Sequence, residues 1–212
     1  VTYTVSRDPS RKAPFNSIRQ ALQNAKVGST IELWDDTYEE NLLLDPARGM
    51  TTAVTLQAAP GKEIIWRGRD ATQPILWIAK GADFKLKGKG IVLDGTVGKE
   101  KVKDLMMITS RNPDLLIEDV QFKSFARSAV LIMNAAGNPG NPIRLKGLWT
   151  VTQENDKPAA AIYFDANPNV PLIPRNEHIE ITDLKCVGID ADKAVSFRDE
   201  KVIGDDVKWP GR

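Results

Sequence analysis

Apolar and polar residues alternate with a period of two along most of the chain after Gly28. In the first half, apolar pairs separated by one residue occur at Ile31 and Leu33, Val54 and Leu56, Leu76 and Ile78, and Phe84 and Leu86. Neighbouring side chains of a strand point to opposite faces, so this period is typical of short strands that bury one face. Turn-forming pairs that contain Gly, Pro, Asn or Asp separate these segments, and the sequence therefore predicts many short strands.

One segment near the N-terminus has helical spacing instead. Its apolar residues are three and four positions apart, at Phe15, Ile18, Leu22 and Ala25. This spacing places them on one face of a helix, and Gly28 follows where a helix often ends in a left-handed residue. The pattern predicts one amphipathic helix, Phe15 to Lys26, and no convincing second helix later in the chain.

The strands also repeat as a unit. An alternating strand, a corner at Gly or Asp and a second short strand recur over residues 115–122, 143–150 and 179–186. A further strand accompanies each unit, and its successive copies begin 24 to 33 residues apart. Three short strands per repeat, joined by corners, indicate a parallel β-helix in which each coil buries its inward residues against its neighbours. A β-sandwich is the competing fold, but two-residue hairpin turns are too rare to favour it.

Composition narrows the classes of function. The chain has 212 residues with 29 basic and 28 acidic side chains, and this balance removes the bulk attraction that nucleic acid or an anionic membrane surface needs. No apolar run approaches the roughly 18 residues of a membrane span. The single cysteine, Cys186, and the single histidine, His178, exclude an internal disulfide and multi-cysteine or His-pair metal sites. We therefore expect no cofactor, no nucleic acid and no membrane insertion.

Three N-terminal segments carry a family resemblance: FNSIRQALQNAKVGSTIEL (15–33), TYEENL (37–42) and VTLQAAPG (54–61). They resemble the start of pectin-lyase-like right-handed β-helix proteins, in which such a stretch forms a helix that caps the solenoid and leads into the first coil. The later Ile-x-Ile-x-Asp-Leu units resemble the internal coils of that family, so the likeness covers nearly the whole chain. Residues 31–34 and 39–44 also resemble β-helix modules attached to planctomycete-type serine/threonine kinases.

The repeat and the resemblance together predict the organisation of the chain. We expect an all-β fold, a single-stranded right-handed parallel β-helix of about five to six coils with an N-terminal capping helix. The whole chain, 1–212, forms one domain, with a capping region at about 1–28, coils at about 29–200 and a tail at about 201–212. The resemblance implies an extracytoplasmic location. Because the chain begins at Val1, we expect a processed form or an excised segment.

The catalytic motifs of the pectin-active families are missing. Polygalacturonases resemble one another in Asn-Thr-Asp, Asp-Asp, Gly-His-Gly and Arg-x-Lys motifs. Asp35-Asp36 and Asp205-Asp206 lie in the opening coil and in the tail rather than in central coils, and His178 has no flanking glycines. The Gly-Tyr-Gln-Asp-Thr stretch of the methylesterases is also absent. These departures disfavour catalysis by a mechanism of the family.

Two weaker candidate sites contain carboxylates. Asp165 and Arg198 take the same outward position on successive coils, about 4.8 Å apart, so they are expected to pair across the coils. Such a pair could serve as a base beside a cation, but a surface ion pair that contributes little stability is the simpler interpretation. The second candidate, for Ca²⁺, is an acidic group formed by Asp35, Asp36, Glu39 and Glu40. A solvated acidic edge is the simpler interpretation of that group.

The most informative surface feature is a row of outward residues on the strand set that forms the binding cleft in this family. The row consists of Trp77, Met107, Leu131 and Tyr163. Outward positions of a solvated sheet should be polar, so an apolar row marks a surface covered by the protein's own loops, by a partner protein or second copy, or by a polysaccharide. Two loops, 134–141 and 165–176, leave the same sheet, and the second is Pro-rich and long enough to wall or cover it.

These observations favour a non-catalytic binding or sensing module, and the resemblance implies that it is the extracytoplasmic part of a larger receptor or serine/threonine kinase-related protein. An enzyme acting on acidic polysaccharide is the alternative, and a structural or oligomerisation module is the third. The row separates them, because an enzyme needs converging carboxylates there, a binding module needs aromatic side chains, and an interface needs a buried apolar stripe.

Overall fold

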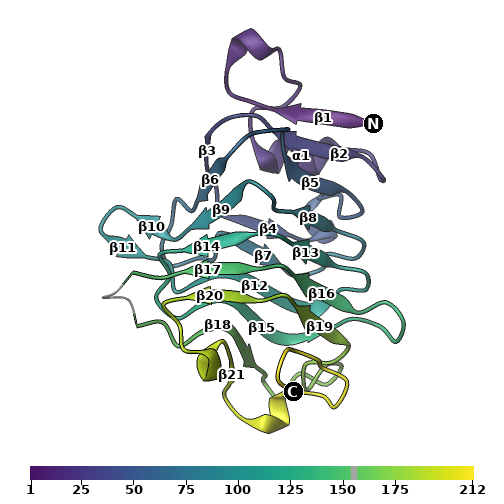
Figure 1. The fold of residues 1–212 in the computed structure, drawn as a ribbon. Coiled ribbons are helices and arrows are strands. Elements are labelled where there is room, and N and C mark those ends of the chain that lie inside the picture. Colours follow the sequence, from purple (N-terminus) through teal and green to yellow (C-terminus); the bar gives the residue numbers. More distant parts are fainter. Residues whose placement is uncertain (154–156) are drawn as a thin grey trace.

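The computed structural model describes residues 1–153 and 157–212, and it is a parallel β-solenoid (Figure 1). The solenoid has about seven turns, and 9% of the chain is helical. The predicted fold class is confirmed, whereas the predicted number of coils, five to six, was too low. An additional strand, β1 (Thr2–Val5), pairs with the first coil ahead of the helix, and the repeat in the sequence does not include it.

Three sheets run along the solenoid, and every strand pair within them is parallel among the described residues. Sheet A contains β1, β2 (Thr30–Leu33), β5 (Thr55–Ala58), β8 (Lys85–Lys87), β13 (Leu116–Glu118), β16 (Ile143–Lys146) and β19 (Ile179–Thr182). Sheet B contains β3 (Thr37–Glu39), β6 (Ile64–Arg67), β9 (Ile91–Asp94), β14 (Gln121–Lys123), β17 (Trp149–Val151) and β20 (Lys185–Val187). Sheet C contains β4 (Leu42–Leu44), β7 (Leu76–Ile78), β12 (Asp104–Arg111), β15 (Ser128–Ala136), β18 (Ala160–Asp165) and β21 (Val195–Phe197). A short antiparallel hairpin, β10 (Thr96–Val97) and β11 (Glu100–Lys101), interrupts one connection from sheet B to sheet C.

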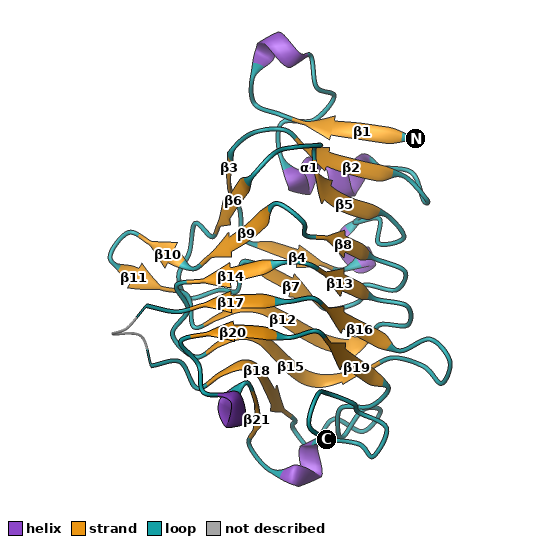
Figure 2. Ribbon diagram, viewed as in Figure 1, coloured by secondary structure: helices purple, strands orange, loops and turns teal. Residues whose placement is uncertain are grey.

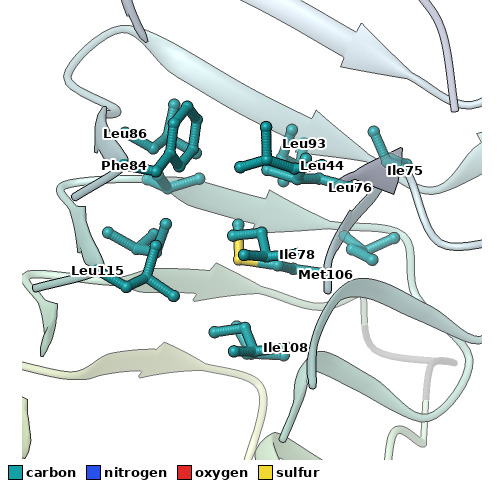
Figure 3. Packing of buried hydrophobic residues seen from close by; sticks show 14 of the residues in the cluster. Leu44, Ile75, Leu76, Ile78, Phe84, Leu86, Leu93, Met106, Ile108 and Leu115 are labelled. Atoms are coloured by element: carbon teal, nitrogen blue, oxygen red, sulfur yellow. The ribbon is translucent and has the colours of Figure 1, made fainter. Parts of the chain in front are cut away.

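The inward residues of successive coils stack in register, as the alternation predicts. On sheet C, Leu76 pairs with Met106 and Ile78 with Ile108, and these four side chains are at most 1% exposed. Figure 3 shows how they meet inward residues of the other two sheets, such as Leu86 and Leu93. No coil can bury these side chains alone, so the stacked coils share one continuous apolar core.

The corners between sheets A and B explain the repeated Gly or Asp of the sequence. Asp119, Gly147 and Asp183 have φ values of 56°, 64° and 53°, in the left-handed region. Short polar residues and glycine tolerate this conformation, which turns the chain sharply without a hairpin. At Gly147 space is also short, because an added Cβ would lie 2.3 Å from Oδ1 of Asp119 on the preceding coil.

The N-terminal end of the core is closed by α1 (Ile18–Asn24), whose residues Ile18, Ala21 and Leu22 are fully buried. The helix is shorter than the predicted 15–26 because Ser17 caps its start and Ala25 is already extended. Gly28, with φ 77°, does not end the helix but lies in the turn that precedes β2. Its N–H donates a hydrogen bond to the Ala53 carbonyl of the next coil. The other helices, shown with α1 in Figure 2, are single 3₁₀ turns: η1 (Pro9–Arg11), η2 (Pro46–Arg48), η3 (Ala191–Lys193) and η4 (Glu200–Val202).

The opposite end of the core is less well covered. Inward positions of the last coil are partly open, with Phe197 38% exposed, although its neighbour Phe164 is fully buried. Cys186 is only partly buried, because no further coil packs on the last one in the described part of the chain; its partial burial raises the pKa of the thiol. The tail returns over this end and places Trp209 6.0 Å from Phe164, ring centre to ring centre. No helix among the described residues has the length and apolar character needed to cross a membrane.

Candidate functional site

The predicted outward row lies on sheet C in register. Trp77 pairs with Met107, Met107 with Leu131, and Leu131 with Tyr163. These four residues are called the sheet C row below. Adjacent strands are about 4.8 Å apart, so the four side chains span about 14 Å along the solenoid. Alternation in each strand positions them, because the residues on either side of each one face the core.

The side chains of the row are partly covered. Leu131 is only 5% exposed, and Trp77, Met107 and Tyr163 are all partly buried. The Trp77 indole N–H donates to Oγ1 of Thr109 at 3.0 Å, which directs the ring toward the next coil. The row is therefore a set of side chains covered in part by their neighbours.

A fixed arginine borders the row where the strands begin. The guanidinium of Arg127 lies over the Tyr163 ring, 5.3 Å from its centre. It donates to the Asp104 carboxylate through Nε at 2.8 Å and through Nη2 at 2.5 Å, and Ser128 donates to the same carboxylate at 2.6 Å. Hydrogen bonding to Asp104 holds the pKa of Arg127 above its ordinary value. The cation is thus held in one place beside the aromatic ring.

A hollow of about 260 Å³ opens at this border of the row. It is lined by Met107, Asp104 and Arg127, by Val102 and Lys103, and by the loop 71–74. The hollow joins apolar, cationic and polar surface over a short distance. This combination suits a sugar, whose C–H faces pack on apolar groups while its hydroxyl groups hydrogen-bond to polar ones.

The other border carries the predicted ion pair. Nη1 of Arg198 lies 3.1 Å from Oδ1 of Asp165, so the pairing across coils is confirmed. The same carboxylate oxygen accepts the N–H of Ala166 at 2.7 Å, and Arg198 also donates to the Ala166 carbonyl. The pair therefore fastens the end of β18, and the Arg198 side chain is half exposed.

The two carboxylates on this face do not converge. Asp165 is level with Thr109 through the register of β12, β15 and β18, and Thr109 is five residues beyond Asp104. At about 3.3 Å per residue, the Cα atoms of the two acids are offset by about 16 Å along the strands. Paired carboxylates of glycoside hydrolases are about 5 to 9.5 Å apart. The backbone positions of Asp104 and Asp165 do not favour that arrangement.

A loop walls the sheet where the strands end. Asn134 Nδ2 donates to the carbonyls of Asn167 and Ile173 at 3.0 and 2.6 Å. Asn176 accepts the N–H of Ala135 at 2.9 Å and donates to the Asp165 carbonyl at 2.9 Å. Loop 166–176 is therefore fixed to β15 and β18. The sequence predicts this loop, but the two asparagines that hold it do not follow from any pattern in the sequence.

Arg127 and Asp104 were also missed, although the sequence held a signal for them. Asp104 and Ser128 are 24 residues apart, the spacing between the start of β12 and the start of β15, and they are register partners. Arg127 directly precedes Ser128, so an acidic residue and a basic residue at nearly the coil spacing mark the Asp104–Arg127 pair in the sequence.

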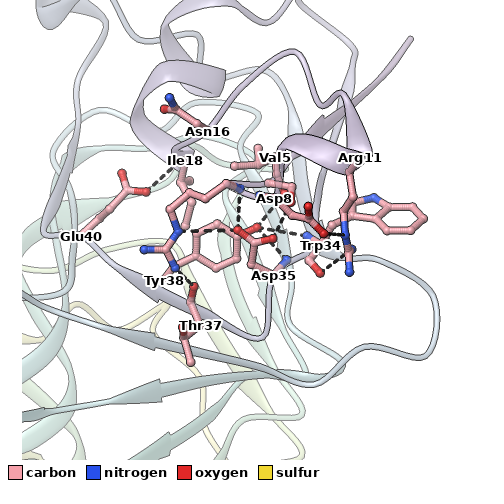
Figure 4. Close-up of polar contacts among 12 residues, drawn as sticks. Val5, Asp8, Arg11, Asn16, Ile18, Trp34, Asp35, Thr37, Tyr38 and Glu40 are labelled. Atoms are coloured by element: carbon pink, nitrogen blue, oxygen red, sulfur yellow. Dashed lines mark hydrogen bonds and ion pairs between the residues drawn. The ribbon is translucent and has the colours of Figure 1, made fainter.

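The predicted acidic group does not form a common site, and Figure 4 shows two of its members, Asp35 and Glu40, engaged with different partners. Asp35 accepts from Ser6 at 2.5 Å and from the N–H of Arg7 at 2.7 Å, whereas Asp36 pairs with Lys62 at 2.9 Å. Glu40 accepts two N–H groups at the start of α1. The fourth member, Glu39, lies in β3. No cluster of three acidic, histidine or cysteine ligands occurs in the described part of the chain.

Beside Asp35, the buried Tyr38 hydroxyl donates to the Val5 carbonyl at 2.7 Å, and burial raises the pKa of Tyr38 to about 12. These contacts join β1 to the first coil, and they make this region a structural joint.

Comparison of the chain with protein-family models, with curated proteins and with solved structures finds no match.

Proposed function

We propose that this protein is a non-catalytic binding module that holds an extended acidic polysaccharide on the outer face of sheet C. The observation that supports it is the sheet C row, in register on four coils and bordered by a fixed arginine at each side. Apolar and aromatic side chains match the C–H faces of sugars, and Arg127 and Arg198 match uronate groups.

The proposal includes membership of the pectin-lyase-like β-helix class and an extracytoplasmic role, within a larger receptor or kinase-related protein. Three parallel sheets and a helix that closes the N-terminal end of the core support that class. Binding without cleavage is supported by the state of the two acids. Asp104 and Asp165 are each paired with an arginine, and their Cα positions are offset by five residues along the strands, which does not favour an acid and a base on one glycosidic bond.

The test is affinity electrophoresis in gels that contain polygalacturonate, with neutral dextran as the comparison. We expect polygalacturonate, but not dextran, to retard the wild-type protein. Trp77→Ala with Tyr163→Ala should weaken binding about tenfold or more, since each aromatic contact is worth about 0.5 to 1.5 kcal/mol.

The matched control is Lys87→Ala with Lys146→Ala. Both residues are exposed on the outer face of sheet A, and each is the register partner of Glu118 on a neighbouring strand. If this control loses binding while the sheet C variant keeps it, the polyanion binds through general charge and the proposal is wrong. Release of reducing ends or unsaturated products that stops on Asp165→Ala would establish the enzyme alternative instead.

A further inference from the structure

A second polar hollow lies at the N-terminal end of the solenoid. It has a volume of about 430 Å³ and is formed by α1 and by the corners that follow β3 and β6. Its lining consists of Ser17, Arg19, Glu40, Asn41 and Arg69. None of these residues belongs to the sheet C row or to its borders.

Two guanidinium groups come together in this hollow. Arg19 donates through Nη2 to the Asn41 carbonyl at 2.8 Å, and Arg69 donates through Nε to the Glu39 carbonyl at 2.7 Å. The two acceptors are two residues apart in the chain, so their Cα atoms are separated by at most about 7 Å. Each guanidinium carries five N–H donors, and the bond that orients it uses one of them.

The hollow is held in shape by Asn41. Its Oδ1 accepts the N–H groups of Arg69 and Asp70 at 2.7 and 2.9 Å. Its Nδ2 donates to the carbonyls of Asp70, Gln73 and Pro74 at 3.0 to 3.3 Å. A Cβ at Gly68 would lie 2.7 Å from this Nδ2, so the turn fits closely around the amide. The backbone that carries Arg69 is therefore positioned before any ligand arrives.

The charge of the lining favours an anion. Glu40 is its one carboxylate among the described residues, and its two oxygens accept the N–H groups of Ile18 and Arg19 at 2.8 and 3.1 Å. Figure 4 shows the bond between Glu40 and Ile18. The neighbouring Asp70 carboxylate is engaged by Thr72, through the N–H at 2.8 Å and the hydroxyl at 2.7 Å. Two cations thus face one carboxylate whose oxygens are already hydrogen-bonded.

Ser17 adds a further donor. Its Oγ accepts the N–H of Gln20 at 3.1 Å, which leaves the hydroxyl hydrogen able to donate into the hollow. Guanidinium groups that approach from different elements can contact different oxygens of one oxyanion. We propose that this hollow binds a phosphate or sulfate group, whose three or more acceptor oxygens can contact both arginines at once better than the two oxygens of a carboxylate can.

The test is an NMR titration of the arginine Nε–H resonances with inorganic sulfate and, separately, inorganic phosphate, against sodium chloride at matched ionic strength. We expect saturable shifts at Arg19 and Arg69. Arg19→Gln and Arg69→Gln should each weaken binding about tenfold, as expected for the loss of charge-assisted hydrogen bonds. Arg69→Lys, which keeps the charge but loses the planar fork, should weaken it less than Arg69→Gln does.

The matched control is Arg48→Gln, because Arg48 is exposed and stands in η2, outside this lining. Equal affinity in Arg48→Gln and wild type supports the site. Equal weakening in Arg48→Gln and Arg69→Gln would mean that the general charge of the protein causes the binding, and it would overturn the proposed site. Shifts that never saturate would overturn it as well. If Arg19→Gln unfolds the protein, the comparison of Arg69→Gln with Arg69→Lys decides whether the site binds the anion.

A second titration compares inorganic sulfate with dextran sulfate and identifies the source of the group. Tighter binding of dextran sulfate, lost in Arg69→Gln, indicates a sulfate carried on a chain, and equal affinities indicate the free ion. The result is independent of the polysaccharide test, which uses a carboxylate polymer and the sheet C row.

Discussion

The outer faces of sheets A and C differ although their inner faces are alike. Both sheets point Ile, Leu and other apolar residues into one core, as packing of stacked coils requires. Outside, sheet A carries mostly charged and polar residues in register, such as Gln57, Lys87, Glu118, Lys146 and Thr182. Sheet C carries the sheet C row at the corresponding positions. The fold dictates the inward residues of both sheets, but it does not require an apolar row outside one of them.

The ion pairs of the two faces differ in the same sense. On sheet C, the side chains of Asp104 and Arg127 are 10% and 27% exposed, and two short hydrogen bonds join them. On the sheet A side, Asp114 and Arg144 are 36% and 42% exposed and 3.6 Å apart. The first pair is sheltered from water, whereas the second is a solvated surface pair.

The largest expected effect follows from this contrast. Asp104→Asn removes one partner of the sheltered pair and weakens the bond from Ser128, so we expect a loss of roughly 3 kcal/mol in the free energy of unfolding. Asp114→Asn should lose less than about 1 kcal/mol. Urea denaturation of both variants measures the difference. Similar losses in the two variants would mean that the Asp104–Arg127 pair contributes no more stability than a solvated surface ion pair.

A smaller effect is expected for a leucine on each face. Leu131 in the row is 5% exposed, whereas Leu116 on the outer face of sheet A is partly exposed. Leu131→Ala should lose about 2 kcal/mol, at the low end for buried leucines, and Leu116→Ala about 1 kcal/mol. Thermal and urea unfolding of the pair provide the values. A larger loss for Leu116 would contradict the claim that neighbours cover the row.

The sequence predicted those parts of the molecule that follow from alternation and repetition. Period-two alternation placed Trp77 and Tyr163 outside, and the common spacing placed Asp165 beside Arg198. Corner residues such as Asp119 marked the bends because few residues tolerate a positive φ. Each of these features depends on local rules that every coil repeats.

The remaining features depend on contacts that no local rule sets. Arg127 lies in a turn, where alternation does not predict the direction of a long side chain. Its guanidinium donates to Asp104 and lies over the Tyr163 ring. The asparagines that fix loop 166–176 act across 33 and 41 residues. The open end of the core, which leaves Phe197 exposed, depends on the absence of a further packed coil among the described residues. Spacing alone carries none of this information.

The most direct test of the central claim locates the ligand by the indole N–H resonances of the tryptophans. Trp77 belongs to the sheet C row, and Trp149, 44% exposed on the outer face of sheet B, is an internal control. During titration with oligogalacturonate, we expect the Trp77 resonance to move saturably and the Trp149 resonance to stay in place. Binding that moves Trp149 and leaves Trp77 unchanged would contradict the account.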